Sequence, residues 1–245
     1  MESEAKFSLE LGLRTTEVDG RLLPRPVTLM GMFQEAAVWQ AERIGRGPRW
    51  LRRNGLAWAM AHTRMRIESL PSWPAELKVT TWSSEMGRFL SRREFVIEHD
   101  GKVVARGSSL WALLDFERRK AVSIPRDVSG RYRTCGERAL ELPFSRPVPP
   151  SLSSVPEKRR VEEHHVDFNE HANNLALLGW LLERGWGSGH VIAELNLRLQ
   201  RELRRGDLVY LHVEKGETDG ERCLLRSALV DECGRFVASA EALYR

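Results

Sequence analysis

Eight consecutive residues, Asp167-Phe168-Asn169-Glu170-His171-Ala172-Asn173-Asn174, gather a carboxylate, an amide and an imidazole in one short segment. In an extended strand, Asp167, Asn169 and His171 would project from the same face, because successive side chains alternate. Asn173 and Asn174 are good N-cap residues for an apolar helix expected at 174–184. The free N–H groups at such a helix start favour negative charge. The segment is typical of a site that handles an acyl group.

The bulk composition is that of an ordinary globular protein. The 245 residues are 42% hydrophobic and 29% charged, with a net charge of +4. Basic residues are interleaved with acids, which argues against nucleic-acid binding and fits an acidic protein partner or an anionic substrate better. The sequence has neither a membrane-length apolar run nor a signal-peptide core, so we expect a cytoplasmic protein without a membrane partner. The odd number of cysteines predicts no disulfide framework.

The two halves of the chain echo each other. Residues 98–111 align with 231–244, residues 64–68 with 196–200, and residues 76–79 with 207–210, at a nearly constant offset. Several matches at one offset indicate an internal repeat, although each match alone is weak. Each copy predicts an opening strand, a long helix and four more strands.

The expected elements follow from hydrophobic periodicity. In the first copy they are a strand at 7–15, a helix at 28–44 and strands at 56–68, 76–83, 88–99 and 102–115. In the second copy they are a strand near 160–165, the helix at 174–184 and strands at 191–200, 208–215, 221–231 and 235–244. The proline-rich segment 124–156 predicts a connection. The apolar second helix indicates burial on most of its surface.

Only the second copy carries the full polar set. Alignment of the helices at Gly31 and Gly179 puts Leu23 opposite His171 and Arg21 opposite Asn169. Alignment of the next strand puts Leu70 opposite Glu202. Each polar residue also has a plain structural interpretation: Asp167 as a turn or cap residue, the asparagines as caps, and His171 and Glu202 as solvated groups. Their joint presence favours a single site per chain.

The segment resembles the signature of the acyl-[acyl-carrier-protein] (acyl-ACP) thioesterases of plant plastids and bacteria. It is carried by Asp167, Asn169, His171, Asn173, Asn174, Gly179, Trp180 and Glu183, and further stretches extend the resemblance over nearly the whole chain. The resemblance implies an α+β double hot-dog fold, with an N-terminal repeat at 1–140, a linker at 141–158 and a C-terminal repeat at 159–245. It also implies hydrolysis of fatty acyl-ACP in fatty acid biosynthesis.

The resemblance assigns the catalytic residues to Asp167, Asn169, His171 and Glu202. The family commonly has a cysteine where this chain has Leu203, so a thiol nucleophile is excluded at that position. Glu202 would activate water or, alternatively, attack the thioester itself. His171 would position and protonate, Asn169 would hold the water or polarise the carbonyl, and Asp167 would orient this pair. The helix start would stabilise the oxyanion.

The acyl chain is expected in an apolar cavity formed by the first-copy helix. Its lining would be Met30, Phe33 and Ala37, with Trp39 and Trp58 as looser candidates. No metal or organic cofactor is expected. The partner would be acyl carrier protein, with Arg204 and Arg205 as the docking surface, and the oligomeric state, including a homodimer, is left open.

Three alternatives share part of this pattern. An acyl-CoA thioesterase would differ only in the carrier of the acyl group. A non-catalytic acyl-binding protein would keep the pocket without a competent acid, which the presence of Glu202 opposes. A hot-dog dehydratase fits the spacing of the histidine and the acid less well.

Overall fold

The structure is a computed structural model that describes residues 5–152, 155–185, 191–219 and 222–245. The chain divides into two compact units. Unit 1 comprises Met1–Ala61 and Met65–Leu142, and unit 2 comprises His62–Arg64 and Pro143–Arg245. Each unit is an antiparallel sheet with one main helix on its face.

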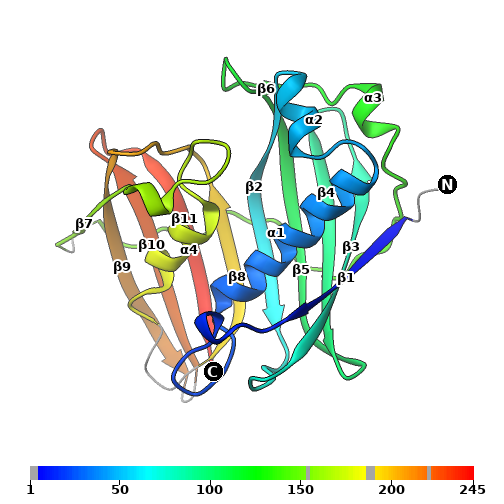
Figure 1. The fold of residues 1–245 in the computed structure, drawn as a ribbon. Helices are drawn as coiled ribbons and strands as arrows, with labels where there is room; N and C mark the ends of the chain where they lie inside the picture. Colours follow the sequence, from blue (N-terminus) through cyan, green and yellow to red (C-terminus); the bar gives the residue numbers. More distant parts are fainter. Residues whose placement is uncertain (1–4, 153–154, 186–190, 220–221) are drawn as a thin grey trace. The chain divides into compact units, whose positions relative to one another are not determined.

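Unit 1 contains an antiparallel sheet in the order β1-β3-β4-β5-β2, with β6 paired to β5 (Figure 1). Its elements, in chain order, are β1 (Lys6–Gly12), η1 (Thr15–Glu17), α1 (Pro26–Arg43), α2 (Pro48–Arg53), β2 (Leu56–Ile67), β3 (Glu76–Met86), β4 (Leu90–His99), β5 (Lys102–Asp115), β6 (Ala121–Val122) and α3 (Arg126–Ser129). The predicted strands and long helix of this copy are confirmed, with shifts at their ends. The short α2 lies between them without having been predicted.

The helix α1 packs its apolar face on β1 and β3. The predicted face of Met30, Phe33, Ala37 and Ala41 is buried, with Met30 and Phe33 each 1% exposed. Phe33 stacks on Phe95 of β4 with 4.5 Å between ring centroids. A Cβ atom at Gly107 of β5 would lie 2.3 Å from the Phe33 ring, so this glycine makes room for the helix.

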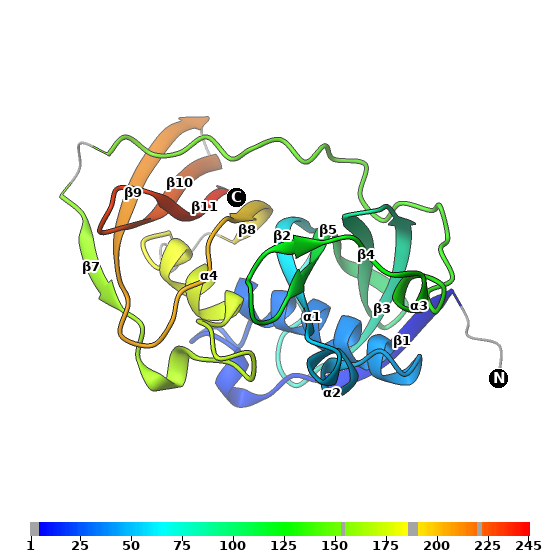
Figure 2. The ribbon, with the colours of Figure 1, turned by 90° about the horizontal axis from the view of Figure 1, so that it is seen from above.

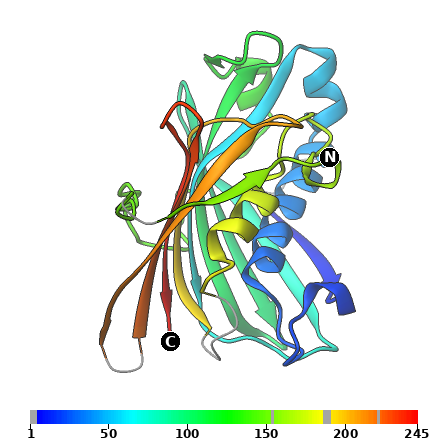
Figure 3. The ribbon, with the colours of Figure 1, turned by 90° about the vertical axis from the view of Figure 1, so that its left-hand side faces the viewer.

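Unit 2 repeats the plan with the strand order β8-β11-β10-β9-β7. Its elements are β7 (Glu157–Arg160), η2 (Glu163–His165), α4 (Asn174–Leu182), β8 (Ile192–Leu199), β9 (Leu208–Asp219), β10 (Arg222–Asp231) and β11 (Phe236–Tyr244). Figures 2 and 3 show α4, in yellow, on one face of the strands coloured orange and red. Four leucines of α4 are buried against β9, β10 and β11: Leu177, Leu178, Leu181 and Leu182.

Two expectations were wrong: one concerned the opening strand of unit 2, and the other the connection between the two units. The opening strand of the second copy was expected at 160–165, but β7 ends at Arg160 and a 3-10 turn occupies Glu163–His165. The segment 124–156 was expected to be a linker, yet it contains α3. It also contains residues 137–140, which we call the strap and which hydrogen-bond to the sheet of unit 1. Local polarity hides both features, because 3-10 turns and straps use the same polar residues as loops.

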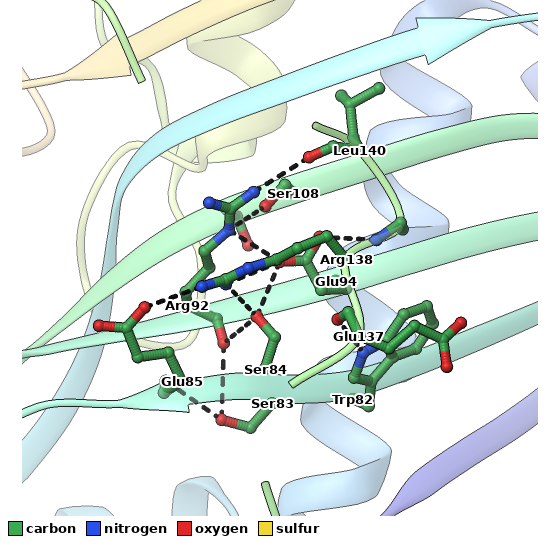
Figure 4. Close-up of polar contacts among 12 residues, drawn as sticks. Trp82, Ser83, Ser84, Glu85, Arg92, Glu94, Ser108, Glu137, Arg138 and Leu140 are labelled. Atoms are coloured by element: carbon green, nitrogen blue, oxygen red, sulfur yellow. Dashed lines mark hydrogen bonds and ion pairs between the residues drawn. The ribbon is translucent and has the colours of Figure 1, made fainter. Parts of the chain in front are cut away.

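A buried carboxylate fastens this strap, residues 137–140, to the sheet of unit 1 (Figure 4). Glu94 of β4 is fully buried and accepts hydrogen bonds from Arg92 Nε at 2.8 Å and from Ser84 Oγ at 2.7 Å. It also accepts the backbone N–H of Ala139 at 3.2 Å and pairs with Arg138 at 3.4 Å. The carboxylate is therefore satisfied from both the sheet and the strap, as a buried charge requires.

Each unit is a sheet curved around one helix, and two such units in one chain are the double hot-dog fold that the resemblance implies. Within the described ranges, no helix has both the length and the apolar character needed for a membrane crossing. All three cysteines are free.

Candidate active site

The polar segment of unit 2 forms a tight loop and not the expected extended strand. We call residues 166–173 the site loop. Val166 and Ala172 pair as an isolated antiparallel bridge, and the N–H of Asp167 donates to the carbonyl of His171 at 2.8 Å. The side chain of Asp167 accepts the N–H of Asn169 at 2.8 Å, and Glu170 adopts a left-handed backbone with φ of 66°. The common face expected for Asp167, Asn169 and His171 is therefore wrong.

Unit 1 contains the same loop without the same chemistry. Asp19 accepts the N–H of Arg21 at 2.9 Å, as Asp167 accepts that of Asn169. Leu22 has a φ of 62°, close to that of Glu170. The predicted correspondence of Arg21 with Asn169 and of Leu23 with His171 is confirmed in three dimensions. Asp19 makes this turn although unit 1 lacks the catalytic residues predicted for unit 2. The turn by itself therefore explains why position 167 is an aspartate.

His171 and Glu202 come together in unit 2. His171 Nε2 lies 3.2 Å from Glu202 Oε2, and the His171 side chain is 8% exposed while that of Glu202 is 36% exposed. The N–H of Ala172 donates to the carbonyl of Leu203 at 2.8 Å, which ties the site loop to the segment after β8. Because this contact uses the backbone, it does not depend on the type of side chain at the buried Leu203. The pair combines a sheltered imidazole with a carboxylate that water can reach.

The start of α4 is capped as the sequence predicts. Asn173 Oδ1 accepts the N–H of Leu175 at 2.8 Å, and the carbonyl of Asn173 accepts those of Ala176 and Leu177. In the part of the chain that the structure describes, Asn174 retains a first-turn N–H without an acceptor. This donor lies at the positive end of the helix.

The structure leaves two predicted relationships open. Asn169 is half-buried in the site loop, and among the described residues its side chain makes no hydrogen bond to the His171–Glu202 pair. Of the expected cavity residues, Met30, Phe33 and Ala37 face the buried side of α1, and Trp58 packs half-buried beside Tyr132. Trp39 is 50% exposed and donates its indole N–H to Glu35, so it lies on the solvent side.

Sequence reasoning missed His165, the last residue of η2. Its Nδ1 accepts the N–H of Glu162 at 3.0 Å, and its carbonyl accepts the N–H of Asn173 at 2.7 Å. The internal repeat holds a signal for this role, because the helix alignment pairs His165 with Glu17, which makes the matching bond to Arg14. Among the described residues, no group of three or more His, Cys, Asp or Glu side chains is placed to hold a metal ion.

Comparison with known proteins places these features in a family. The family description "Acyl-ACP thioesterase N-terminal domain" matches residues 4–132. The chain is 23% identical over 229 residues to oleoyl-acyl carrier protein thioesterase 1 of Arabidopsis thaliana, an alignment of 85% of this chain and 63% of that protein. It is 24% identical over 230 residues to the palmitoyl-acyl carrier protein thioesterase of Gossypium hirsutum, covering 83% of this chain and 53% of that one. The chain thus spans less than two thirds of either relative.

Solved structures show the same fold. A putative oleoyl thioesterase from Lactobacillus plantarum superposes with a TM-score of 0.87 at 18% identity, over 98% of this chain and 96% of the other. The 12:0-ACP thioesterase from Umbellularia californica gives a TM-score of 0.85 at 22% identity, over 98% and 94%. The family match covers more than half of the sequence, and the chain belongs to the acyl-ACP thioesterase family.

Proposed function

We propose that this protein hydrolyses the thioester of fatty acyl-ACP to give a free fatty acid and the carrier thiol, as part of fatty acid biosynthesis. The observation that carries the proposal is the contact between His171 Nε2 and Glu202 Oε2 at 3.2 Å, beside a capped helix start. Membership of the thioesterase family supports the same reaction.

In this mechanism Glu202 is the general base. Its carboxylate takes a proton from water, and the resulting hydroxide attacks the carbonyl carbon of the thioester. The Asn174 N–H is the proposed donor to the oxyanion. When the carbon–sulfur bond breaks, the proton moves through His171 to the leaving thiolate. Direct attack by Glu202 to form a mixed anhydride is the alternative route.

Two further residues of the site loop have supporting roles. Asn169 holds the water or polarises the carbonyl, and Asp167 shapes the loop by accepting the Asn169 N–H. The acyl chain is assigned to the apolar side of α1, at Met30, Phe33 and Ala37, with Trp58 nearby in unit 1 and Trp39 as a rim residue. The reaction, as written, uses no metal or cofactor.

The deciding experiment is a turnover assay on acyl-ACP substrates of several chain lengths, with the matching acyl-CoA substrates in parallel. Hydrolysis of at least one acyl-ACP supports the proposal. Release of one free fatty acid for each acyl-ACP consumed identifies the reaction. Tight acyl binding without turnover would favour the acyl-binding alternative instead.

The duplicated turn provides a matched pair of variants. Asp167→Ala removes the acceptor for the Asn169 N–H, and we expect lower kcat because the loop then positions Asn169 and His171 poorly. Asp19→Ala removes the equivalent bond in unit 1 and should leave kcat near wild type. Asp167→Ala should lose about 1 kcal/mol of unfolding free energy, the usual value of one such bond. Asp19→Ala should lose more, because Asp19 also accepts the N–H of Leu23 at 3.0 Å and pairs with the Arg21 side chain at 2.9 Å. Steady-state kinetics and urea unfolding measure both effects, and equal kcat losses in the two variants would contradict the assignment.

A second test concerns the carrier. Acyl carrier proteins are strongly acidic, while this chain has a net charge of +4 and exposed arginines follow Glu202. We expect higher kcat/KM on acyl-ACP than on the matching acyl-CoA, with an advantage that shrinks as salt shortens the screening length to about 8–10 Å. Arg205 pairs with Glu163 at 2.8 Å, and both side chains are exposed, so this pair can rearrange for a partner.

Charge reversal tests where the carrier docks. Arg204→Glu and Arg205→Glu should lower kcat/KM on acyl-ACP at low salt and leave the values on acyl-CoA almost unchanged. Arg222→Glu is the matched control, because Arg222 begins β10 opposite Asp219, at the far end of β9 from residues 204–205. Equal or better use of acyl-CoA at every salt concentration would assign the protein to the acyl-CoA alternative.

A further inference from the structure

His165 closes the 3-10 turn that precedes the site loop. The N–H of Glu162 donates to His165 Nδ1 at 3.0 Å, and the N–H of His165 donates to the backbone carbonyl of Glu162 at 3.0 Å. A side chain three residues into a helical turn that reaches back to the N–H of the residue before the turn is usually Glu or Gln. Here the acceptor is an imidazole nitrogen, which is lost as an acceptor when it is protonated.

Unit 1 makes the same turn with a carboxylate oxygen as the acceptor. The N–H of Arg14 donates to Glu17 Oε2 at 2.8 Å. The carbonyl of Glu17 accepts the N–H of Arg25, the N-cap of α1, at 3.1 Å. A carboxylate keeps its acceptor oxygens through the range in which a histidine titrates. The fold therefore accepts either group, and the histidine stands in the copy that carries the site.

The His165 residue connects three parts of unit 2. Its carbonyl accepts the N–H of Asn173, the cap of α4, at 2.7 Å. Its ring meets the ring of Trp180 of α4 edge-on, with 4.8 Å between centroids. The next residue, Val166, forms the bridge to Ala172 that closes the site loop. Movement of His165 would therefore disturb the loop at both of its ends.

The surroundings of His165 favour its neutral form. Partial burial, followed by repulsion from His164, lowers the pKa of His165 from its usual 6.5, while Glu162 acts in the opposite direction. The His164 ring lies 3.9 Å from that of His165. On the facing element, α4 presents Trp180 and contains no ionisable residue, and Glu163 of the same turn pairs with Arg205. Near neutral pH the Nδ1 acceptor is intact.

We propose that His165 is a positioning residue for the site loop, and that protonation of its Nδ1 releases the loop from the start of α4 and slows hydrolysis in acid. The catalytic part of this inference rests on the proposed function. The structural part does not, because it concerns only the hydrogen bonds that hold the site loop, residues 166–173, in place.

Amide hydrogen exchange on the full chain tests the structural part. In the wild type, we expect the protection factor of the Asn173 amide to fall by up to about tenfold per pH unit below the midpoint at which His165 titrates by NMR. His165→Gln supplies an acceptor at every pH and should abolish this fall. The converse variant, Glu17→His, should create an acid-dependent fall at the Arg25 amide of unit 1.

Kinetics on the same variants test the catalytic part. The acid limb of kcat should contain a step at the His165 midpoint in the wild type, and His165→Gln should remove that step with little change in KM. Glu17→His should leave the kcat profile as in the wild type. The inference is overturned if the Asn173 amide of His165→Gln still loses protection in acid. It is also overturned if the protection of the wild-type Asn173 amide stays constant while His165 titrates. Failure of every acyl-ACP to be hydrolysed would refute the proposed function, and Asn173 exchange would still decide the role of His165.

Discussion

Replacement of Glu202 by glutamine is expected to lower kcat by about 10²–10⁴-fold, the usual contribution of a general base. The amide keeps the size of the side chain and can still contact His171 Nε2, but it cannot take a proton from water. KM should change much less, because Glu202 acts on the water and not on the acyl chain. The measurement is kcat and KM at saturating acyl-ACP, with circular dichroism to confirm that the variant is folded.

Glu170→Gln is the matched control for this experiment. It removes the same charge from an exposed side chain of the site loop, without removing the proposed base. A small effect of Glu170→Gln beside a large effect of Glu202→Gln separates base catalysis from a general loss of negative charge. Near wild-type turnover in Glu202→Gln would remove Glu202 from the mechanism.

Isotope labelling detects direct attack by Glu202 when the mixed anhydride is hydrolysed at its glutamyl carbon, since hydrolysis at the acyl carbon labels the fatty acid just as activated water does. In a single turnover in ¹⁸O water, activated water delivers the label to the fatty acid and leaves the protein unlabelled. Recovery of ¹⁸O in the Glu202 carboxylate by peptide mass spectrometry would instead establish direct attack through a mixed anhydride, hydrolysed at the glutamyl carbon.

Replacement of Glu94 by leucine is expected to cause the largest loss of stability, about 3–5 kcal/mol of unfolding free energy. The change removes the Glu94 carboxylate from both Arg92 and Arg138, whose side chains are only 17% and 24% exposed. It also removes the acceptor of the Ala139 N–H, so the strap should detach from the sheet. Urea unfolding measures the loss.

Glu85→Leu is the control for Glu94→Leu, because Glu85 binds the same Arg138 at 3.0 Å with a side chain that is 64% exposed. A surface pair of this kind contributes at most about 1 kcal/mol. Similar losses in the two variants would show that burial of Glu94 adds nothing, and a loss below about 1 kcal/mol in Glu94→Leu would contradict the proposed fastening.

The architecture could be predicted largely from periodicity and internal repetition. The face of α1 at Met30 and Phe33 and the Asn173 cap are local signals, and both are confirmed. The match of Arg21 to Asn169 followed from alignment of the two helices, and the two loops make equivalent hydrogen bonds. These features depend on residues close in sequence, so the sequence contains the information directly.

The geometry of the site loop could not be predicted in the same way. Alternation along Asp167, Asn169 and His171 fits a strand, but an aspartate two residues before a free N–H also fits a turn, and the turn forms. The approach of His171 to Glu202 depends on the bond from the Ala172 N–H to the Leu203 carbonyl, which joins residues 31 positions apart through backbone atoms alone. No side-chain pattern encodes such a contact.

The shared left-handed residues bear on how this protein could be made more robust. Leu22 and Glu170 both adopt positive φ, although only the second stands beside reactive groups, so the unusual conformation belongs to the inherited fold and stores no energy for chemistry. A non-glycine residue in this conformation costs about 1–2 kcal/mol. Glycine at position 22 would relieve that cost at a distance in sequence from the working loop. Leu22→Gly in unit 1 is therefore expected to raise thermal stability without the loss of catalytic rate that often accompanies stabilising substitutions.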